Sequence, residues 1–121
     1  MDFGILTVHT SPKENLRELE GLRVLYENVL DEEDNVMIMG DLNADCYYLD
    51  ESDEISLRNG EYTWVIDDFQ DTTVSKSDCA YDRIIFKEDM EQYYTGKSGT
   101  YRNITDDVSD HYPIWIELKT S

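Results

Sequence analysis

Residues 3–39 predict a strand, a long helix and a second strand in direct succession. The run at 3–9 is rich in β-forming residues and too short for anything but a strand. Residues 36–39 form a second short apolar run, which predicts a buried strand. Between the two runs lies one apolar stripe at helical spacing, made of Leu16, Leu19, Leu22, Tyr26, Val29 and Leu30. This order favours a sheet with a long helix packed on it.

The predicted helix has a start signal and a stop signal. Ser11 is expected to accept a hydrogen bond from a backbone amide of the first turn, and Pro12 suits the first helical position. Glu14 is expected to reach back to Ser11 and complete a capping box. The acidic residues at 31–34 then end the helix, because negative charge is unfavourable at a helix C-terminus.

The remainder of the chain is mainly β in pattern. Further strands are predicted at 62–66, 81–86 and 113–118, whereas residues 45–60 form a looser, acid-rich stretch. Residues 87–107 are polar and punctuated by glycine, which indicates a loop or a short edge strand. The expected fold class is α/β (α+β), with a mixed sheet and few helices in one domain spanning 1–121.

The net charge of the chain limits its partners. Twenty-eight acidic against ten basic residues leave a formal charge of -18. Such a surface repels nucleic acids and anionic membranes unless cations bridge the charges. Two explanations remain open, a generally acidic soluble surface and adaptation to a high-salt environment, where a Debye length of about 3 Å removes most self-repulsion.

Neither a membrane span nor a signal peptide is expected. The chain contains no apolar run of about 20 residues, and its first residues lack a basic leader region. The chain begins directly with the first predicted strand, so we expect a piece of a longer protein and no membrane partner.

Three polar clusters lie at strand edges, at 40–43, 81–83 and 109–113. Asp41, Asn43, Asp82 and Asp110 offer hard oxygen ligands suited to Mg²⁺, Mn²⁺ or Ca²⁺. Phosphodiester hydrolysis needs such a cation together with a base for water and help for the leaving oxygen. The only two histidines are His9 and His111. Taken singly, an Asp-x-Asn is more often a turn, and a histidine at a strand end is more often structural.

In this order the clusters resemble the endonuclease/exonuclease/phosphatase superfamily, through Gly40-Asp41-Leu42-Asn43 and Ser109-Asp110-His111-Tyr112-Pro113. That superfamily also includes abasic-site endonucleases, inositol polyphosphate phosphatases and sphingomyelinases. Residues 40–46, residues 78–84 and Asp71-Thr72-Thr73 are similar to its deoxyribonuclease I branch in particular. The resemblance covers essentially the whole chain but only the C-terminal half of the family. It implies half of a layered β-sandwich, with one mixed, mostly antiparallel sheet and a long helix packed on it.

The resemblance implies catalytic roles for particular residues. His111 would activate water as the base and be held by Asp82, while His9 would face the leaving oxygen or the scissile phosphate. The metal and phosphate ligands would be Asp41, Asn43 and Asp110.

Further residues have implied binding roles. A structural Ca²⁺ loop would consist of Asp71, Thr73, Ser75 and Ser77. Contacts to DNA would come from Tyr81, Asn43 and Ser77. Arg83 lies beside the site, where a purely structural role is an open alternative.

Cys46 and Cys79 are the only cysteines. From the residues alone, two reduced thiols and one disulfide are equally acceptable. The resemblance implies the disulfide, which would contribute about 3–4 kcal/mol in the chain-entropy model. A disulfide in turn favours an extracellular or other oxidising compartment.

The expected function is an endodeoxyribonuclease with little sequence specificity, using Mg²⁺ or Mn²⁺ for catalysis and Ca²⁺ structurally. One alternative is a catalytically weak or inactive half-domain that binds metal, DNA or a partner, and another is a phosphatase or sphingomyelinase of the same superfamily. The family's first half supplies a metal-binding glutamate and a second glutamate that orients the His9 equivalent, so reduced activity is expected.

A lone half would also expose the inner face of its sheet. We therefore expect a homo-oligomer such as a dimer, formed through the apolar strands at 3–8, 36–39 and 114–118. A complementing N-terminal half, or a monomer with a more polar face, are the alternatives.

Overall fold

The computed structural model describes residues 3–46, 48–50, 52–67, 70–74, 78–105 and 107–119. Its main sheet has four strands in the order β1-β2-β4-β3, with bounds Gly4–His9, Val36–Asp41, Asp82–Lys87 and Tyr62–Trp64 in that order. β1 and β2 are parallel, whereas β4 is antiparallel to both β2 and β3. A second sheet pairs β5 (Tyr94–Thr100) with β6 (Ile114–Leu118) in antiparallel fashion. The predicted mixed sheet is confirmed.

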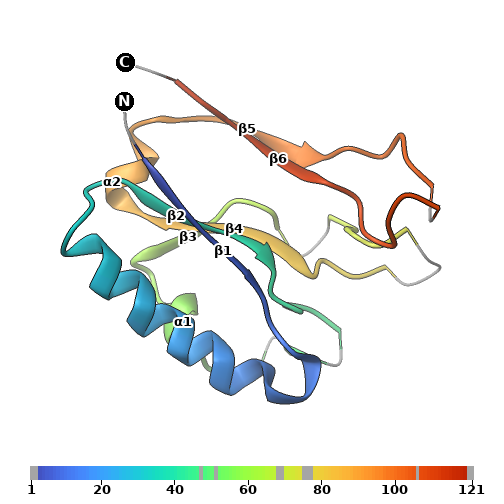
Figure 1. Cartoon of the computed structure of the whole chain (residues 1–121), viewed down its shortest axis with the longest axis horizontal. Coiled ribbons are helices and arrows are strands. Elements are labelled where there is room, and N and C mark those ends of the chain that lie inside the picture. Colours follow the sequence, from blue (N-terminus) through green and yellow to red (C-terminus); the bar gives the residue numbers. More distant parts are fainter. Residues whose placement is uncertain are drawn as a thin grey trace.

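The long helix α1 (Asn15–Leu30) crosses from β1 to β2 and covers one face of the main sheet (Figure 1). A parallel strand pair requires such a crossover, which explains why the helix stands between these two strands in the sequence. Leu19, Leu22 and Tyr26 pack into a core cluster with Val36 and Ile38. The Tyr26 hydroxyl donates to the Val36 carbonyl at 2.8 Å, so this buried phenol is satisfied.

The structure corrects the predicted helix start. A 3-10 turn, η1 (Pro12–Glu14), precedes α1, and this shift brings Glu18 rather than Glu14 to Ser11. The Ser11 amide donates to Glu18 at 2.6 Å and its hydroxyl donates to the same carboxylate at 3.0 Å. Leu16 is 43% exposed, so the apolar stripe begins at Leu19, and Asn15 takes the first buried position of the helix.

The β5–β6 ribbon covers part of the opposite face of the main sheet (Figure 1). There Met37, Ile84 and Phe86 form a second core cluster against Ile114 and Ile116. The expectation that this inner face would be bare is therefore corrected in part, because the chain folds its own C-terminal ribbon across it.

Residues 87–107 contain more regular structure than predicted, namely the short helix α2 (Glu88–Glu91) and all of β5. The side chains of β5 are mostly polar and show no clear alternation, so backbone pairing with β6 decides its conformation. One further 3-10 turn, η2 (Ser56–Arg58), lies in the acid-rich stretch. None of the helices within the described residues is long and apolar enough to span a lipid bilayer.

Candidate metal and catalytic site

The centre of the site is set by the pairing of two strands. β2 ends at Asp41 and β4 begins at Asp82, and the antiparallel register places these two residues directly opposite each other. Gly40 precedes Asp41 where β1 approaches closely, and a Cβ at this glycine would overlap the carbonyl oxygen of Val8. The glycine is therefore required for the β1–β2 spacing that brings Asp41 into place.

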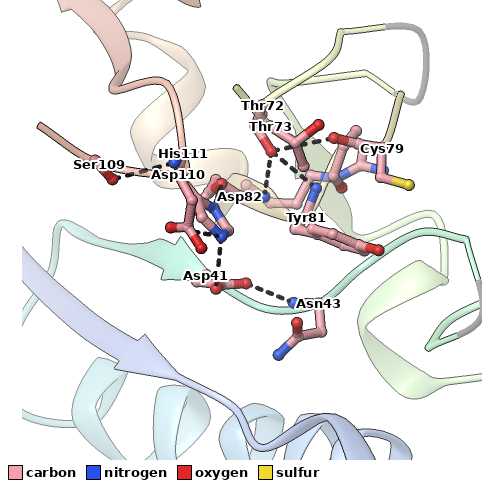
Figure 2. Close-up of polar contacts among 12 residues, drawn as sticks. Asp41, Asn43, Thr72, Thr73, Cys79, Tyr81, Asp82, Ser109, Asp110 and His111 are labelled. Carbon is pink, nitrogen blue, oxygen red and sulfur yellow. Dashed lines mark hydrogen bonds and ion pairs between the residues drawn. The ribbon is translucent and has the colours of Figure 1, made fainter. Parts of the chain in front are cut away.

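His111 joins the two aspartates from the loop before β6 (Figure 2). Its Nδ1 lies 2.6 Å from Asp82 Oδ2, and its Nε2 lies 3.6 Å from Asp41 Oδ2. The hydrogen bond to Asp82 raises the pKa of His111 to about 9, with Asp41 and Asp110 adding to the effect and burial opposing it. Ligand atoms of Asp41, Asp82 and His111 all lie within 4.8 Å of one another, as a metal site requires.

His9 approaches the same centre at the end of β1. Its Nε2 lies 3.3 Å from Asp41 Oδ2, the oxygen that also faces His111. The side chain of His9 is 77% exposed, whereas that of His111 is 26% exposed. The two predicted catalytic histidines therefore meet at one carboxylate oxygen, but His9 is held much more loosely.

Asn43 is fixed by a ring of buried hydrogen bonds. Its amide nitrogen donates to the Thr10 carbonyl at 2.8 Å and to the Thr10 hydroxyl at 3.0 Å. That hydroxyl donates to Asn15, whose own amide nitrogen donates back to the Asn43 carbonyl at 3.0 Å. Figure 2 shows the amide nitrogen of Asn43 turned away from Asp41. Because both amide protons face Thr10, the side-chain oxygen is the atom that Asn43 can offer to a cation.

Asp110 lies at the rim of the site. Its side chain is 85% exposed, and its Oδ1 lies 3.8 Å from His111 Nε2. The Asp110 carbonyl accepts a hydrogen bond from the Val74 amide at 2.9 Å, which anchors the backbone but leaves the carboxylate in solvent. Asp41 and Asp110 therefore lie at similar distances from His111 Nε2, 3.6 and 3.8 Å, and differ in that Asp110 is far more exposed.

Thr72 organises the site, although the sequence predicts no role for it. Its buried hydroxyl accepts hydrogen bonds from the Tyr81 and Asp82 amides at 3.0 and 3.2 Å (Figure 2). Its carbonyl accepts from the Tyr112 amide at 2.8 Å. One threonine thus holds the start of β4 next to the loop that carries His111. The only signal in the sequence was its place in the Asp71-Thr72-Thr73 segment.

The disulfide joins Cys46 to Cys79, with their Cα atoms 6.0 Å apart. It connects the loop after Asp41 to the segment that leads into β4. Asp45 strengthens the same connection by accepting a hydrogen bond from the Ala80 amide at 2.9 Å. The expected disulfide is therefore present and braces both sides of the site.

Arg83 has the structural role that was left open. Its buried guanidinium donates to three carbonyls in three separate segments, those of Ala80, Ile66 and Ala44, at 2.6–3.0 Å. It also lies 5.4 Å from the ring centre of Trp64. Arg83 therefore holds the loop that follows Asp41 in place, through the Ala44 carbonyl.

Tyr81 forms an aromatic wall beside His111. The ring centres of Tyr81 and His111 are 6.2 Å apart, and the ring centre of Tyr48 lies 5.6 Å from that of Tyr81. Burial raises the pKa of Tyr81, and the nearby Tyr48, Asp45 and Asp41 add to the shift. The phenol is thus a neutral group available to a ligand at the site.

The proposed Ca²⁺ loop is described only in part. Asp71 Oδ1 accepts hydrogen bonds from the Thr73 amide and hydroxyl at 2.9 and 2.7 Å, which closes a tight turn. Ser75 and Ser77 lie outside the described residues. The Ca²⁺ loop and the DNA contact of Ser77 therefore stay predictions.

Deoxyribonuclease-1-like 2 of Mus musculus is 33% identical over 98% of this chain and 49% of its own length. Deoxyribonuclease-1 of Sus scrofa is 34% identical over 98% of this chain and 47% of its own length. The mannosyl-6-phosphatase of Bacteroides thetaiotaomicron aligns in structure with a TM-score of 0.66 at 14% identity, over 96% of this chain and 50% of that one. No family model matches the chain.

These similarities define the fold as a fragment of a deoxyribonuclease I-like fold. The chain is a homologue of deoxyribonuclease I and deoxyribonuclease I-like proteins, as its motifs predicted. It spans about half the length of the curated relatives it matches.

Proposed function

We propose that this chain carries the catalytic base and metal ligands of an endodeoxyribonuclease that requires a divalent metal and has little sequence specificity. The observation that supports this most directly is the His111–Asp82 hydrogen bond of 2.6 Å beside Asp41. The relatives are named deoxyribonucleases, which favours DNA as the substrate. Residues 1–121 are proposed to form one domain.

His111 is proposed to take a proton from water at Nε2. Its Nδ1 faces Asp82, so Asp82 fixes the ring orientation and leaves Nε2 directed toward Asp41. His111 can accept a proton only when neutral, and its pKa is raised chiefly by the hydrogen bond to Asp82, with smaller contributions from Asp41 and Asp110. Neutralising these carboxylates therefore favours the active form of the base. His9 is proposed to face the leaving oxygen or the scissile phosphate as an acid or electrostatic partner.

The donor set fits Mg²⁺ or Mn²⁺. Asp41 offers a carboxylate oxygen close to Asp82 and His111. Asn43 and Asp110 offer further oxygens near the end of β2. Carboxylate and amide oxygens are the ligands these hard cations prefer. A bound cation would neutralise charge on the phosphate oxygens. Ca²⁺ at Asp71 and Thr73 would have a structural role.

The acidic surface predicts weak binding of DNA. With a charge of -18, attraction to the phosphate backbone has to come from bound cations and from local donors such as the Tyr81 hydroxyl. The affinity for DNA of any sequence should therefore be low. Adaptation of this acidic surface to a high-salt environment stays a prediction. The disulfide favours an extracellular or other oxidising compartment.

A second candidate function is a weakly active or inactive half-domain that binds metal, DNA or a partner. The exposure of His9 and Asp110, together with half-length coverage of the relatives, favours this candidate. A phosphatase or sphingomyelinase of the same superfamily ranks third. The solved phosphatase supports only the common fold at 14% identity, and residues 78–84 resemble the deoxyribonuclease branch instead.

The test is nicking of supercoiled plasmid in Mg²⁺ and in Mn²⁺. We expect slow nicking that is lost in His111→Ala and in excess EDTA, while Asp34→Ala, in an exposed turn outside the site, keeps the original rate. Equal nicking by the original chain and His111→Ala would overturn the proposal. A melting temperature raised by Mn²⁺ without nicking would favour the half-domain candidate.

A further inference from the structure

A pocket of about 380 Å³ lies between η1, the first turn of α1 and Tyr48. The charged residues that line it are Lys13, Arg17 and Glu14. We call it the Lys13–Arg17 pocket. Basic residues outnumber acidic ones here, in a chain where acidic residues outnumber basic ones by 28 to ten. A local excess of positive charge on so acidic a surface favours an anionic ligand at this place.

One buried side chain ties this pocket to the candidate site. Asn15 lines the pocket, is 2% exposed, and donates from Nδ2 to the carbonyls of Tyr48 and Asn43 at 3.1 and 3.0 Å. Its Oδ1 accepts from the Thr10 hydroxyl, which in turn accepts from the Asn43 amide nitrogen. The wall of the pocket is therefore held in a fixed position relative to Asn43, a proposed metal ligand.

Two ring contacts lead from the proposed base to the pocket. The ring centre of Tyr81 lies 6.2 Å from that of His111 and 5.6 Å from that of Tyr48. Tyr48 is 37% exposed, so part of its ring is open to a ligand. Aromatic rings stack on nucleic-acid bases of any sequence. A DNA strand bound at His111 therefore has an aromatic wall that leads to the Lys13–Arg17 pocket.

The two cations of the pocket can accept a new partner. The Arg17 side chain is 78% exposed, and its Nε lies 3.1 Å from Oε2 of Glu14, which is itself 54% exposed. Within the described parts of the chain, neither the terminal nitrogens of Arg17 nor Nζ of Lys13 has a hydrogen-bond partner. So exposed an ion pair contributes little free energy, which a phosphate can replace. Arginine holds phosphate by two parallel hydrogen bonds, and lysine adds a point charge.

We propose that the Lys13–Arg17 pocket binds a backbone phosphate of DNA that flanks the scissile phosphate. Arg17 pairs with the phosphate through its terminal nitrogens, Lys13 supplies a second positive charge, and Tyr48 packs against the adjoining sugar or base. Contacts to phosphate carry no sequence information, in keeping with low sequence specificity. The subsite rests on that part of the proposed function which makes DNA the ligand.

The test measures binding of a fluorescently labelled DNA duplex by anisotropy, in Mg²⁺ at several KCl concentrations. All variants carry His111→Ala, so that the duplex stays intact. Replacing both Lys13 and Arg17 by Gln should weaken binding about tenfold or more, since hydrogen bonds to charged groups are lost. The slope of log affinity against log salt should become shallower by about one to two, because each phosphate contact accounts for about one.

Replacing both Lys97 and Lys119 by Gln is the matched control. It changes the net charge by the same amount, but at exposed positions of the β5–β6 ribbon. Lys119 follows the end of β6, whereas His111 precedes the start of that strand. The affinity and the salt slope should stay close to those of His111→Ala alone. Circular dichroism confirms that each variant is folded.

Glu14→Gln tests the pocket in the opposite direction. It removes the acidic group that pairs with Arg17, so DNA binding should tighten about twofold to fivefold. Glu32→Gln removes the same charge in the exposed turn after α1 and should have little effect.

Three results would each overturn the subsite: no DNA binding by the chain in Mg²⁺, an unchanged salt slope in the Lys13 and Arg17 double variant, or equal weakening by the ribbon control. Plasmid nicking with His111 intact separates this proposal from the proposed function. Nicking that keeps its KM in the double variant overturns the subsite and leaves the nuclease function standing. A shallower salt slope without nicking by the original chain supports the subsite and refutes the nuclease function.

Discussion

The Nδ1 atom of His111 lies 2.6 Å from Oδ2 of Asp82, and the two residues are 29 positions apart in the chain. This contact joins the loop before β6 to the first residue of β4. It sets the orientation and the proton affinity of the proposed base, and our predictions begin from it.

Replacing Asp82 by Asn should lower the pKa of His111 in the metal-free protein. The pKa is about 9 chiefly because of the hydrogen bond to Asp82, while burial acts in the opposite direction. An amide removes the charge, so the pKa should fall by more than one unit. Titration of the His111 ring by NMR in EDTA measures it, with a His9→Asn variant to assign the signal. An unchanged pKa in Asp82→Asn would contradict this origin of the shift.

The same shift predicts how stability depends on pH. The folded pKa of about 9 lies above the ordinary value of 6.5, so protonated His111 stabilises the metal-free fold. That stabilisation is complete below pH 6.5 and is lost as the pH rises to about 9. Urea unfolding in EDTA should show the difference in free energy of unfolding between the original chain and His111→Asn shrinking across this range. A constant difference from pH 6 to 9.5 would refute the prediction.

Replacing Asp41 by Asn should weaken Mn²⁺ binding. Asp41 belongs to the one group of three acidic or histidine residues with suitable geometry among the described residues. We expect the dissociation constant for Mn²⁺ to rise about tenfold or more. Even residues that only hydrogen-bond to the metal ligands change metal affinity by roughly 10–100-fold when they are replaced. Free Mn²⁺ is measured by electron paramagnetic resonance. Asp34→Asn removes the same charge in an exposed turn and should have little effect.

Gly40→Ala should destabilise the fold. An added Cβ would overlap the Val8 carbonyl in the parallel β1–β2 pair, and neither backbone can move away without breaking the sheet. We expect a loss of about 1–3 kcal/mol or more in the free energy of unfolding. Gly21→Ala is the matched control, because a Cβ there meets nothing within 4 Å inside α1. It should gain up to about 1 kcal/mol. Urea unfolding compares the two, and similar effects would contradict the packing argument.

Thr72→Val should reduce both stability and activity. The substitution keeps the shape of the side chain but leaves the Tyr81 and Asp82 amides without their shared acceptor. We expect a cost of about 1–3 kcal/mol, measured by thermal and urea unfolding. Nicking should fall because Asp82 is displaced from His111. The control is Thr95→Val on the exposed side of β5, where a change below about 0.5 kcal/mol is expected.

Local sequence patterns predicted those strands whose conformation follows from the residue types they contain. The apolar runs at 3–9 and 36–39 became β1 and β2, because short β-rich runs that are buried have few other conformations. For residues 87–107 the pattern left a loop and a short edge strand open, and pairing with β6 decides for the strand β5. The pattern failed at the helix start, where η1 brought Glu18 rather than Glu14 to Ser11.

By itself the sequence determined which chemical groups are present and, through its motifs, the kind of protein they belong to. It supplied two histidines, the aspartates at strand edges and two cysteines, and it confined a few of them to strand ends. Only the tertiary structure decided that His9 and His111 meet at one oxygen of Asp41, that Asn43 turns its nitrogen to Thr10, and that Thr72 joins β4 to the His111 loop. These contacts depend on sheet register and buried hydrogen bonds between residues far apart in the chain, which no local pattern encodes.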